Sequence, residues 1–407
     1  MRNQRAATRG RGMGGRRPDL VRERAVISRR ALMVSVTAAL TADCAGLPLI
    51  RPSDAQAGDL GASQCTRSGA PLTEAEFELL RASVDTPALA AASHLATGEG
   101  RQLATGVRQR GLPGAVTASD RWHMGSITKS MTATLVARCV EAGVLGWDDT
   151  IGVRLGARFP DMRAEYRDAT LRHLLSHRAG LQTEVVDLAT MRLPLQEADP
   201  RESRLTVARQ ALRQPPAGPR ERTFLYSNSG YVIAGVLLEE ALGAPWETLI
   251  RSLLFRPLGM RATGFGAPGA IGGGDQPVGH ASWLTESVTP HPPGSPLSDI
   301  PAAWGPAGRV HASLGDMMKY LDAHRRRSGL LRRETWNTLH TPPFGGDYAL
   351  GWHVRSEGLW HNGTNSLWYA EALVDPAGGR ASIAACNDGR LAAVRPIVHA
   401  ALMGVLT

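Results

Sequence analysis

Ser126 and Lys129 stand three residues apart, and together they could form a nucleophile with its base. The chain has two lysines against 44 arginines, so a lysine retained here suggests chemistry that arginine cannot perform. An arginine guanidinium is effectively never deprotonated, whereas a lysine ammonium can lose its proton when it is desolvated. A neutral lysine amine beside a serine hydroxyl can activate that hydroxyl as a nucleophile. On a helix, residues three apart share one face, which would bring the hydroxyl and the amine together.

The helix that carries this pair has an apolar pattern. Apolar residues recur at three- and four-residue spacing after Ser126, as in a buried helix, and Gly143 suits its C-terminal cap. Ser-x-x-Lys alone also occurs by chance on exposed helices, so the tetrapeptide is a weak signal without this context. Lys129 is therefore expected on a mostly buried helix, where its charge needs polar partners.

A second polar group is Tyr226-Ser227-Asn228, between Pro215-Pro216 and a helix predicted to begin near Gly230. A phenol can carry protons when nearby cations favour its ionisation, and an amide can bind both a substrate carbonyl and an ammonium. A tyrosine on a loop more often packs its ring on the core, so this group is weak evidence alone.

A third group is His361-Asn362-Gly363-Thr364, just ahead of a predicted strand. Glycine lets another backbone or a ligand approach a strand edge closely, and such an edge can present a backbone N–H to an oxyanion. The alternative is an ordinary surface turn after Trp360.

In this order and at these separations, the three groups resemble the class C β-lactamase and DD-peptidase (penicillin-binding protein) superfamily of active-site serine enzymes. That superfamily carries Ser-x-x-Lys, then Tyr-x-Asn, then Lys-Thr-Gly or His-x-Gly. The resemblance spans roughly residues 85 to 400, and further matching stretches are Trp122-His123-Met124-Gly125, Asp148-Asp149, Leu174-Leu175-Ser176-His177-Arg178-Ala179-Gly180-Leu181 and Arg256-Pro257-Leu258-Gly259-Met260.

The resemblance implies a role for each matching position. Ser126 would be the acylated nucleophile, and Lys129 and Tyr226 would share the general-base and general-acid work. The substrate-binding and oxyanion residues would be Asn228, which orients substrate, His361, which faces substrate, and Gly363 and Thr364, with the backbone N–H groups of Ser126 and Thr364 forming the oxyanion hole.

Two departures from the superfamily pattern bear on the substrate. His361 stands where most β-lactamases have lysine, and an ordinary histidine is charged only near or below pH ~6.5. Asn362 replaces the hydroxyl residue that usually contacts a substrate carboxylate. Both departures favour a different acyl substrate: a D-amino peptide, a simple ester, or a penicillin that is turned over slowly.

The order of the predicted elements indicates an α+β fold, and the resemblance makes it β-lactamase/transpeptidase-like. Strands are predicted over 87–97 and 101–108 in the first part of the chain and over 348–354, 365–374 and 381–386 in the last part, with helices between them. We expect an antiparallel sheet built from both ends and flanked by helices, with an inserted mainly helical domain. The predicted boundaries are 1–57 for an export signal, 58–128 for the first part of the sheet domain, 129–300 for the helical domain with a Gly/Pro-rich loop at 264–308, and 301–407 for the second part of the sheet domain.

Charge and composition point to export. The formal net charge is +9 over 407 residues, but residues 1–57 hold eleven arginines and four acids, which leaves about +2 for the rest. Ser28-Arg29-Arg30-Ala31-Leu32-Met33 resembles a twin-arginine signal, and Ala55-Gln56-Ala57 offers a cleavage site. The apolar run that follows the two arginines is too short to span a membrane. We expect a periplasmic or extracellular protein, with lipoprotein anchoring at Cys44 the less favoured alternative.

Several other classes of site are disfavoured. Cys65, Cys139 and Cys386 are too few and too widely spaced for a disulfide framework, and whether any of them pair stays open. His173 and His177 are four apart, but the intervening glutamate of a zinc protease is missing. No P-loop and no Gly-x-Ser-x-Gly motif occurs. We therefore expect no metal, cofactor, nucleic acid or integral membrane span, and a small-molecule or peptide substrate; the oligomeric state stays open.

The predicted function is an exported active-site serine hydrolase that acts through an acyl-enzyme on a β-lactam, a D-alanyl peptide or a small ester. The alternative is a penicillin- or cell-wall-peptide-binding protein that has the same fold but does not turn over.

Overall fold

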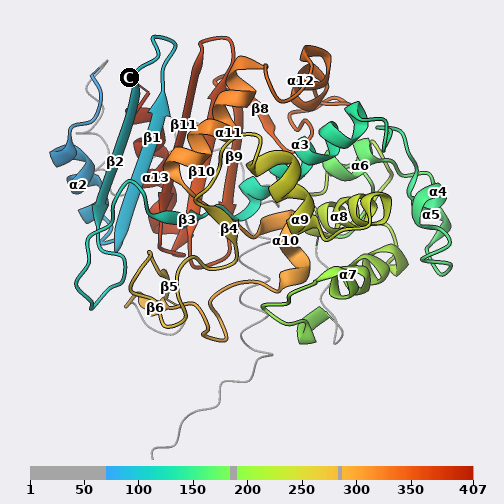
Figure 1. Ribbon diagram of the computed structural model, residues 1–407, viewed down its shortest axis with the longest axis horizontal. Helices are drawn as coiled ribbons and strands as arrows, with labels where there is room; N and C mark the ends of the chain where they lie inside the picture. The colour runs from blue at the N-terminus through green and yellow to red at the C-terminus, as the bar shows by residue number, and fades with distance from the viewer. Residues whose placement is uncertain (1–69, 184–189, 283–286, 407) are drawn as a thin grey trace, which may run out of the picture.

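A computed structural model describes residues 70–183, 190–282 and 287–406 (Figure 1). The predicted export signal and Cys65 lie outside these residues, so the structure does not test them. Within them, no helix is both long enough and apolar enough to cross a membrane. Cys139 and Cys386 are buried free thiols.

The main element is a six-stranded antiparallel sheet in the order β2-β1-β11-β10-β9-β8. Strand β1 comes from the first part of the chain and pairs with β11 from the last part, so the prediction of an α+β sheet built from both ends is confirmed. The strands are β1 (Ala88–His94), β2 (Gly100–Gly106), β8 (His353–Arg355), β9 (Gly358–Thr364), β10 (Tyr369–Asp375) and β11 (Arg380–Cys386).

Helices cover both faces of this sheet. Side chains along a strand point alternately to opposite faces, and β1 shows this directly. Leu89 and Ala91 pack in one cluster with helix α13 (Leu391–Gly404), whereas Ala90 and Ala92 pack in the cluster that includes helix α11 (Leu314–Arg326). Helix α2 (Glu74–Ala82) lies beside β2 (Figure 1).

The middle of the chain is mainly helical and lies beside the sheet (Figure 1). Helix α3 (Thr128–Glu141) packs against α8 (Asn228–Leu242) and the short α10 (Gly305–Gly308). The remaining helices are α4 (Ile151–Leu155), α5 (Ala164–Arg167), α6 (Leu171–Leu175), α7 (Arg201–Arg213), α9 (Trp246–Ile250), which continues as a π-helical turn over Arg251–Phe255, and α12 (Arg333–His340). Two small sheets have the orders β3-β7-β4 (Arg121–His123, Val310–Ser313, Thr263–Phe265) and β5-β6 (Gly279–Ala281, Thr289–His291).

Local sequence signals match the structure best where a cap or a turn defines an element. Thr73 and Glu76, spaced as Thr-x-x-Glu, form a capping box at the start of α2, and Ser313 caps α11 by accepting from the backbone N–H of Asp316. Two strand boundaries are wrong. Strand β8 begins only at His353, after a predicted strand start at 348, and residues 361–364 lie inside β9, not ahead of a strand. The Gly/Pro-rich segment expected as loop contains β5, β6 and α10.

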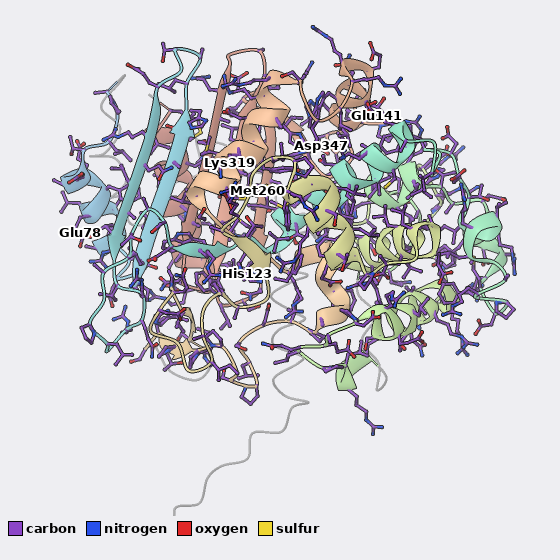
Figure 2. All side chains as sticks on the ribbon, in the orientation of Figure 1. Glu78, His123, Glu141, Met260, Lys319 and Asp347 are labelled. Atoms are coloured by element: carbon purple, nitrogen blue, oxygen red, sulfur yellow. The ribbon has the colours of Figure 1, made fainter. Side chains whose placement is uncertain are left out.

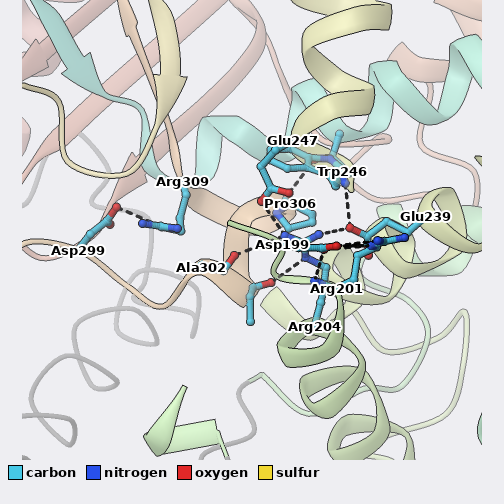
Figure 3. Close-up of polar contacts among 12 residues, drawn as sticks. Asp199, Arg201, Arg204, Glu239, Trp246, Glu247, Asp299, Ala302, Pro306 and Arg309 are labelled. Carbon is cyan, nitrogen blue, oxygen red and sulfur yellow. Dashed lines mark hydrogen bonds and ion pairs between the residues drawn. The ribbon is translucent and has the colours of Figure 1, made fainter. Parts of the chain in front are cut away.

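The buried side chain of Arg204, on α7, forms ion pairs and hydrogen bonds with α8, with α9 and with the segment before α10 (Figure 3). Arg204 is fully buried; it pairs with Glu239 and lies 2.7 Å from Glu247 Oε1. Its Nε also donates to the carbonyl of Ala303 at 3.2 Å, and Glu239 accepts from the N–H of Trp246 at 2.8 Å. Burial raises the pKa of Glu239 to about 7, and the charge of Arg204 opposes that rise. The guanidinium therefore neutralises buried charge at a junction of four segments.

We expect Arg204→Met to lower the free energy of unfolding by about 3–5 kcal/mol, because it leaves buried carboxylates without their cation. The loss should be smaller at acidic pH, where Glu239 can take up a proton. Urea denaturation at two pH values measures both effects. Arg201→Met is the control, since the Arg201–Asp199 pair at 2.6 Å is well exposed and its loss should matter far less. Equal losses in the two variants would contradict a structural role for the Arg204 network.

Candidate active site

Ser126 and Lys129 meet at the junction of a 3₁₀ turn and a helix. Ser126 lies in the turn Gly125–Ile127, and Lys129 lies in the first turn of α3. Lys129 Nζ is 2.8 Å from Ser126 Oγ. Ser126 is partly exposed, whereas every other residue from Trp122 to Ala137 is buried. Ser126 is therefore partly open to solvent, while Lys129 beside it is covered.

Lys129 has two further partners from distant parts of the chain. Its Nζ donates to Asn228 Oδ1 at 2.6 Å and to the carbonyl oxygen of Ala307 at 2.8 Å. Asn228 begins α8 and Ala307 lies in α10. The side chain of Lys129 is fully buried, so these acceptors replace the water that a charged amine would otherwise bind.

Tyr226 lies against the same amine. Lys129 Nζ is 4.7 Å from the centre of the Tyr226 ring, which is within the range of a cation–π contact. Ser227, the next residue, caps α8 by accepting from Gly230 N, and this cap fixes the direction in which the chain enters the helix. The predicted Tyr226-Ser227-Asn228 group is thus brought to the Ser126–Lys129 pair.

His177 supports Tyr226 from the side. The two rings are 4.2 Å apart between centroids, and His177 Nδ1 accepts from the backbone N–H of Ser227 at 3.0 Å. Burial, together with the charge of Lys129, holds the pKa of His177 well below its usual range. The imidazole is therefore a neutral acceptor that holds the Tyr226–Ser227 backbone.

The two histidines considered as a metal pair have separate partners. The side chain of His173 completes the capping box of α6 with Thr170, and its Nε2 lies 2.9 Å from Glu221 Oε1. His177 faces Tyr226 instead. Across the residues that the structure describes, no cluster of three potential metal ligands occurs.

Strand β9 approaches the serine turn so closely that only glycine fits at two positions. A methyl group on Gly363 would overlap the carbonyl oxygen of Met124 and lie 2.6 Å from Ser126 N. Gly125 has φ of +48°, and a methyl group on it would overlap Thr364 N. The backbone nitrogens of Ser126 and Thr364 are therefore brought to the same small region beside Ser126 Oγ.

His361 lies at this site, but it does not carry the positive charge that an exposed histidine could carry. It is buried; its Nε2 is 3.1 Å from Tyr348 Oη and its Nδ1 is 2.6 Å from the carbonyl of Asn362. Burial and the charges of His353 and Lys129 hold the pKa of His361 well below its usual range. The ring is neutral at neutral pH.

Asn362 points the other way. Successive strand residues face opposite sides, and Gly363 contacts the serine turn, so Asn362 faces the opposite side of β9. Its Nδ2 donates to Tyr369 Oη at 3.4 Å, and Tyr369 belongs to the cluster packed under α13. Asn362 is therefore engaged away from Ser126.

Comparison with known proteins agrees with this geometry. The Beta-lactamase family model matches residues 78–402. The chain belongs to the Beta-lactamase family. Penicillin-binding protein 4 of Amycolatopsis lactamdurans is 27% identical over 334 residues, which cover 77% of this chain and 84% of that protein. The curated relatives of this chain also include Unguisins hydrolase ungD of Aspergillus violaceofuscus, and by its family this chain is a serine hydrolase.

Solved structures share the fold of this chain. SurE superimposes with a TM-score of 0.65 at 25% identity, over 82% of this chain and 75% of SurE. D-amino acid amidase from Ochrobactrum anthropi SV3 superimposes with a TM-score of 0.65 at 20% identity, over 81% of this chain and 97% of the amidase. The predicted family and β-lactamase/transpeptidase-like fold are confirmed.

Sequence reasoning assigned no role at this candidate site to four residues that the structure places in or around it. The carbonyl of Ala307 leaves no side-chain signature, and Asp299 lies in a Gly/Pro-rich segment whose conformation could not be read. Tyr348 was expected only as the start of a strand, yet its hydroxyl contacts His361. His123, labelled in Figure 2, was part of a matching stretch but had no assigned role.

We expect the imidazole of His361 to stay neutral from about pH 8 to about pH 5.5, because its pKa lies well below the ordinary value. Proton–carbon NMR correlation of the histidine rings measures this, with His361→Gln to assign the signal. His399 is the internal control: it is half exposed, and its hydrogen bond to Glu371 raises its pKa, so it should titrate above the ordinary range. A His361 signal that titrates near pH ~6.5 would restore the cationic interpretation.

Proposed function

We propose that Ser126 is the acylated nucleophile of this hydrolase and that Lys129 is its base. The observation that carries the proposal is the set of acceptors around Lys129 Nζ. Asn228 Oδ1 and the Ala307 carbonyl can only accept, whereas the Ser126 hydroxyl can accept or donate. An ammonium would donate one N–H to each of the three. A neutral amine would keep its two N–H groups on the fixed acceptors, and its lone pair would then face the Ser126 hydroxyl.

The proposed reaction follows from this arrangement. The Ser126 hydroxyl gives its proton to Lys129 Nζ as Oγ attacks the substrate carbonyl carbon, and the carbonyl oxygen becomes an oxyanion near Ser126 N and Thr364 N. Collapse of the tetrahedral intermediate breaks the bond to the leaving group, which takes up a proton through Tyr226 or Lys129. Water then attacks the acyl-enzyme by the reverse route, releases the acid and restores Ser126.

The proposed substrate is an ester or an amide. Its binding does not depend on a substrate carboxylate held by a charged His361. A neutral His361 offers no charge to a carboxylate, and Asn362 is engaged with Tyr369. Small esters and aminoacyl amides fit such a site better than β-lactams or D-alanyl peptides, which we expect to react more slowly. The likeness to a D-amino acid amidase supports this order.

Three finer assignments remain part of the proposal. Within the family, the Tyr226-Ser227-Asn228 and His361-Asn362-Gly363 groups favour the class C-related branch. The arginine-rich segment 1–57 favours export to the periplasm or the medium. The chain divides into a sheet domain from both ends and a helical domain over about 129–300, with the site between them.

The alternative is a penicillin- or cell-wall-peptide-binding protein that is acylated but not turned over. The similarity to Penicillin-binding protein 4 favours this alternative over an inert fold. The two functions differ in deacylation: a hydrolase frees Ser126 repeatedly, whereas a binding protein stays acylated.

A fluorophosphonate probe tests the nucleophile. We expect the wild-type protein to be labelled and Ser126→Ala to be unlabelled, with the fluorescence in a denaturing gel as the measurement. A fluorescent penicillin, together with turnover of a short-chain ester, a D-alanyl dipeptide and a cephalosporin, separates hydrolase from binder. A wild-type protein that neither labels nor hydrolyses any of these substrates would sink the proposal.

Lys129→Arg should lose activity by a factor of at least ~100, because a guanidinium keeps its proton and cannot serve as a base. Initial rates of ester hydrolysis measure the loss. The matched control is Lys319→Arg. Lys319 lies on α11, is half exposed, and bonds to Asp316 Oδ1 and the Gly259 carbonyl, so its replacement should leave the rate unchanged (Figure 2). Near-normal activity in Lys129→Arg would refute the base.

A further inference from the structure

We propose that Asp299 is a positioning residue that holds together the two backbone segments whose N–H groups form the oxyanion hole. This inference rests on the proposed function, because it concerns the hole beside Ser126. Asp299 does not touch the substrate in this proposal. It acts through His123 on one segment and through Asn365 on the other.

The first link runs to the serine turn. Asp299 Oδ1 lies 3.2 Å from His123 Nε2, and both side chains are almost fully buried. The other ring nitrogen, His123 Nδ1, accepts from the backbone N–H of Gly125 at 3.1 Å. That hydrogen bond requires Nδ1 to be unprotonated, which places the ring proton on Nε2, the nitrogen that contacts Asp299 Oδ1 at 3.2 Å without the angle of a regular hydrogen bond. Gly125 directly precedes Ser126, so the carboxylate orients the turn that carries Ser126 N.

The second link runs to the end of β9. Asn365 Nδ2 donates to the same oxygen, Asp299 Oδ1, at 3.0 Å. Asn365 directly follows Thr364, and its own Oδ1 accepts from Leu367 N at 3.2 Å. One carboxylate oxygen thus contacts the residue after Thr364 and the histidine that binds the residue before Ser126.

The third link runs to α10 through the second oxygen. Arg309 Nε donates to Asp299 Oδ2 at 3.2 Å (Figure 3). Arg309 is the residue after α10, the helix whose Ala307 carbonyl binds Lys129. Asp299 therefore connects the three segments that supply the backbone groups of the site.

A charged carboxylate suits this junction better than a neutral amide. Burial disfavours the ionised form of Asp299, but the contact with His123, the charge of Arg309 and the hydrogen bond from Asn365 hold the pKa of its carboxyl well below its usual range. An ionised carboxylate accepts at both oxygens, whereas an amide presents one acceptor and one donor. In Asp299→Asn the amide NH2 would face either His123 and Asn365 or Arg309, so at least one of the three links would be lost.

Such a junction matters because an oxyanion hole must fit the tetrahedral intermediate more closely than the trigonal carbonyl. If the two N–H groups drift apart, stabilisation of the intermediate falls while ground-state binding changes little. A defect of this kind differs from a general loss of stability, which lowers the amount of folded enzyme without changing what each folded molecule does.

The experiment compares Asp299→Asn with wild type in hydrolysis of p-nitrophenyl acetate and in inhibition by phenylboronic acid, which forms a tetrahedral adduct with a serine. We expect kcat to fall about 10- to 100-fold, the boronate inhibition constant to rise in parallel, and KM to change less than about 3-fold. Asn365→Ala severs a single link, should show a smaller change in the same direction, and serves as the test if Asp299→Asn does not fold.

The matched control is Asp388→Asn, which breaks another buried aspartate–arginine contact, with Arg390 at 2.7 Å, outside the site. It should lower the melting temperature but leave kcat and boronate affinity unchanged. The proposal is overturned if Asp299→Asn or Asn365→Ala changes melting temperature alone, as the control does. That result in an active wild-type enzyme would refute the junction and leave the proposed function standing; a wild type that does not react with the fluorophosphonate would refute the function itself.

Discussion

The site depends on a fully buried lysine whose amine binds oxygens of Ser126, Asn228 and Ala307. Removing an ammonium from water without replacing its hydrogen bonds would cost several kcal/mol, on the order of the whole stability of a domain. The partners of Lys129 come from the 3₁₀ turn before α3, from the start of α8 and from α10. Each of these segments must therefore place its oxygen acceptor beside Lys129 Nζ. The packing of the helices holds the acceptors in that position.

The sheet meets the same point from the other side. Strand β9 lies next to the short outer strand β8. The end of β9 at Gly363 reaches the serine turn at backbone contact distance. Because the approach is backbone to backbone, it supplies N–H groups whose direction does not depend on side-chain rotamers. Preformed groups of this kind need little reorganisation when charge develops on a bound carbonyl. The helical part thus holds Lys129, the proposed base, and the sheet contributes one of the two backbone N–H groups of the proposed oxyanion hole.

The sequence allowed those parts of the site to be predicted that depend on residue type and local spacing. Ser126 and Lys129 are neighbours because they are three apart, and Tyr226 and Asn228 stand at the cap of a helix that the sequence marks. The charge of His361 could not be predicted, because it depends on burial among His353, Tyr348 and Lys129. The contact made by the Ala307 carbonyl could not be predicted either, since every residue has a main-chain carbonyl. The role proposed for Asp299 could not be predicted either, because its carboxylate contacts three segments that are distant in the sequence.

The unequal surroundings of the two lysines have a consequence for protein labelling. Lys319 exposes about half of its side chain, whereas Lys129 exposes none. A reagent that attacks primary amines from solution therefore meets a single accessible lysine side chain, on the outer face of α11. Attachment of such a reagent to Lys129 would require it to enter past Ser126 and displace the oxygen partners of the amine. Mass-spectrometric mapping of amine modification would thus report in this chain on whether the surroundings of Lys129 open to solvent.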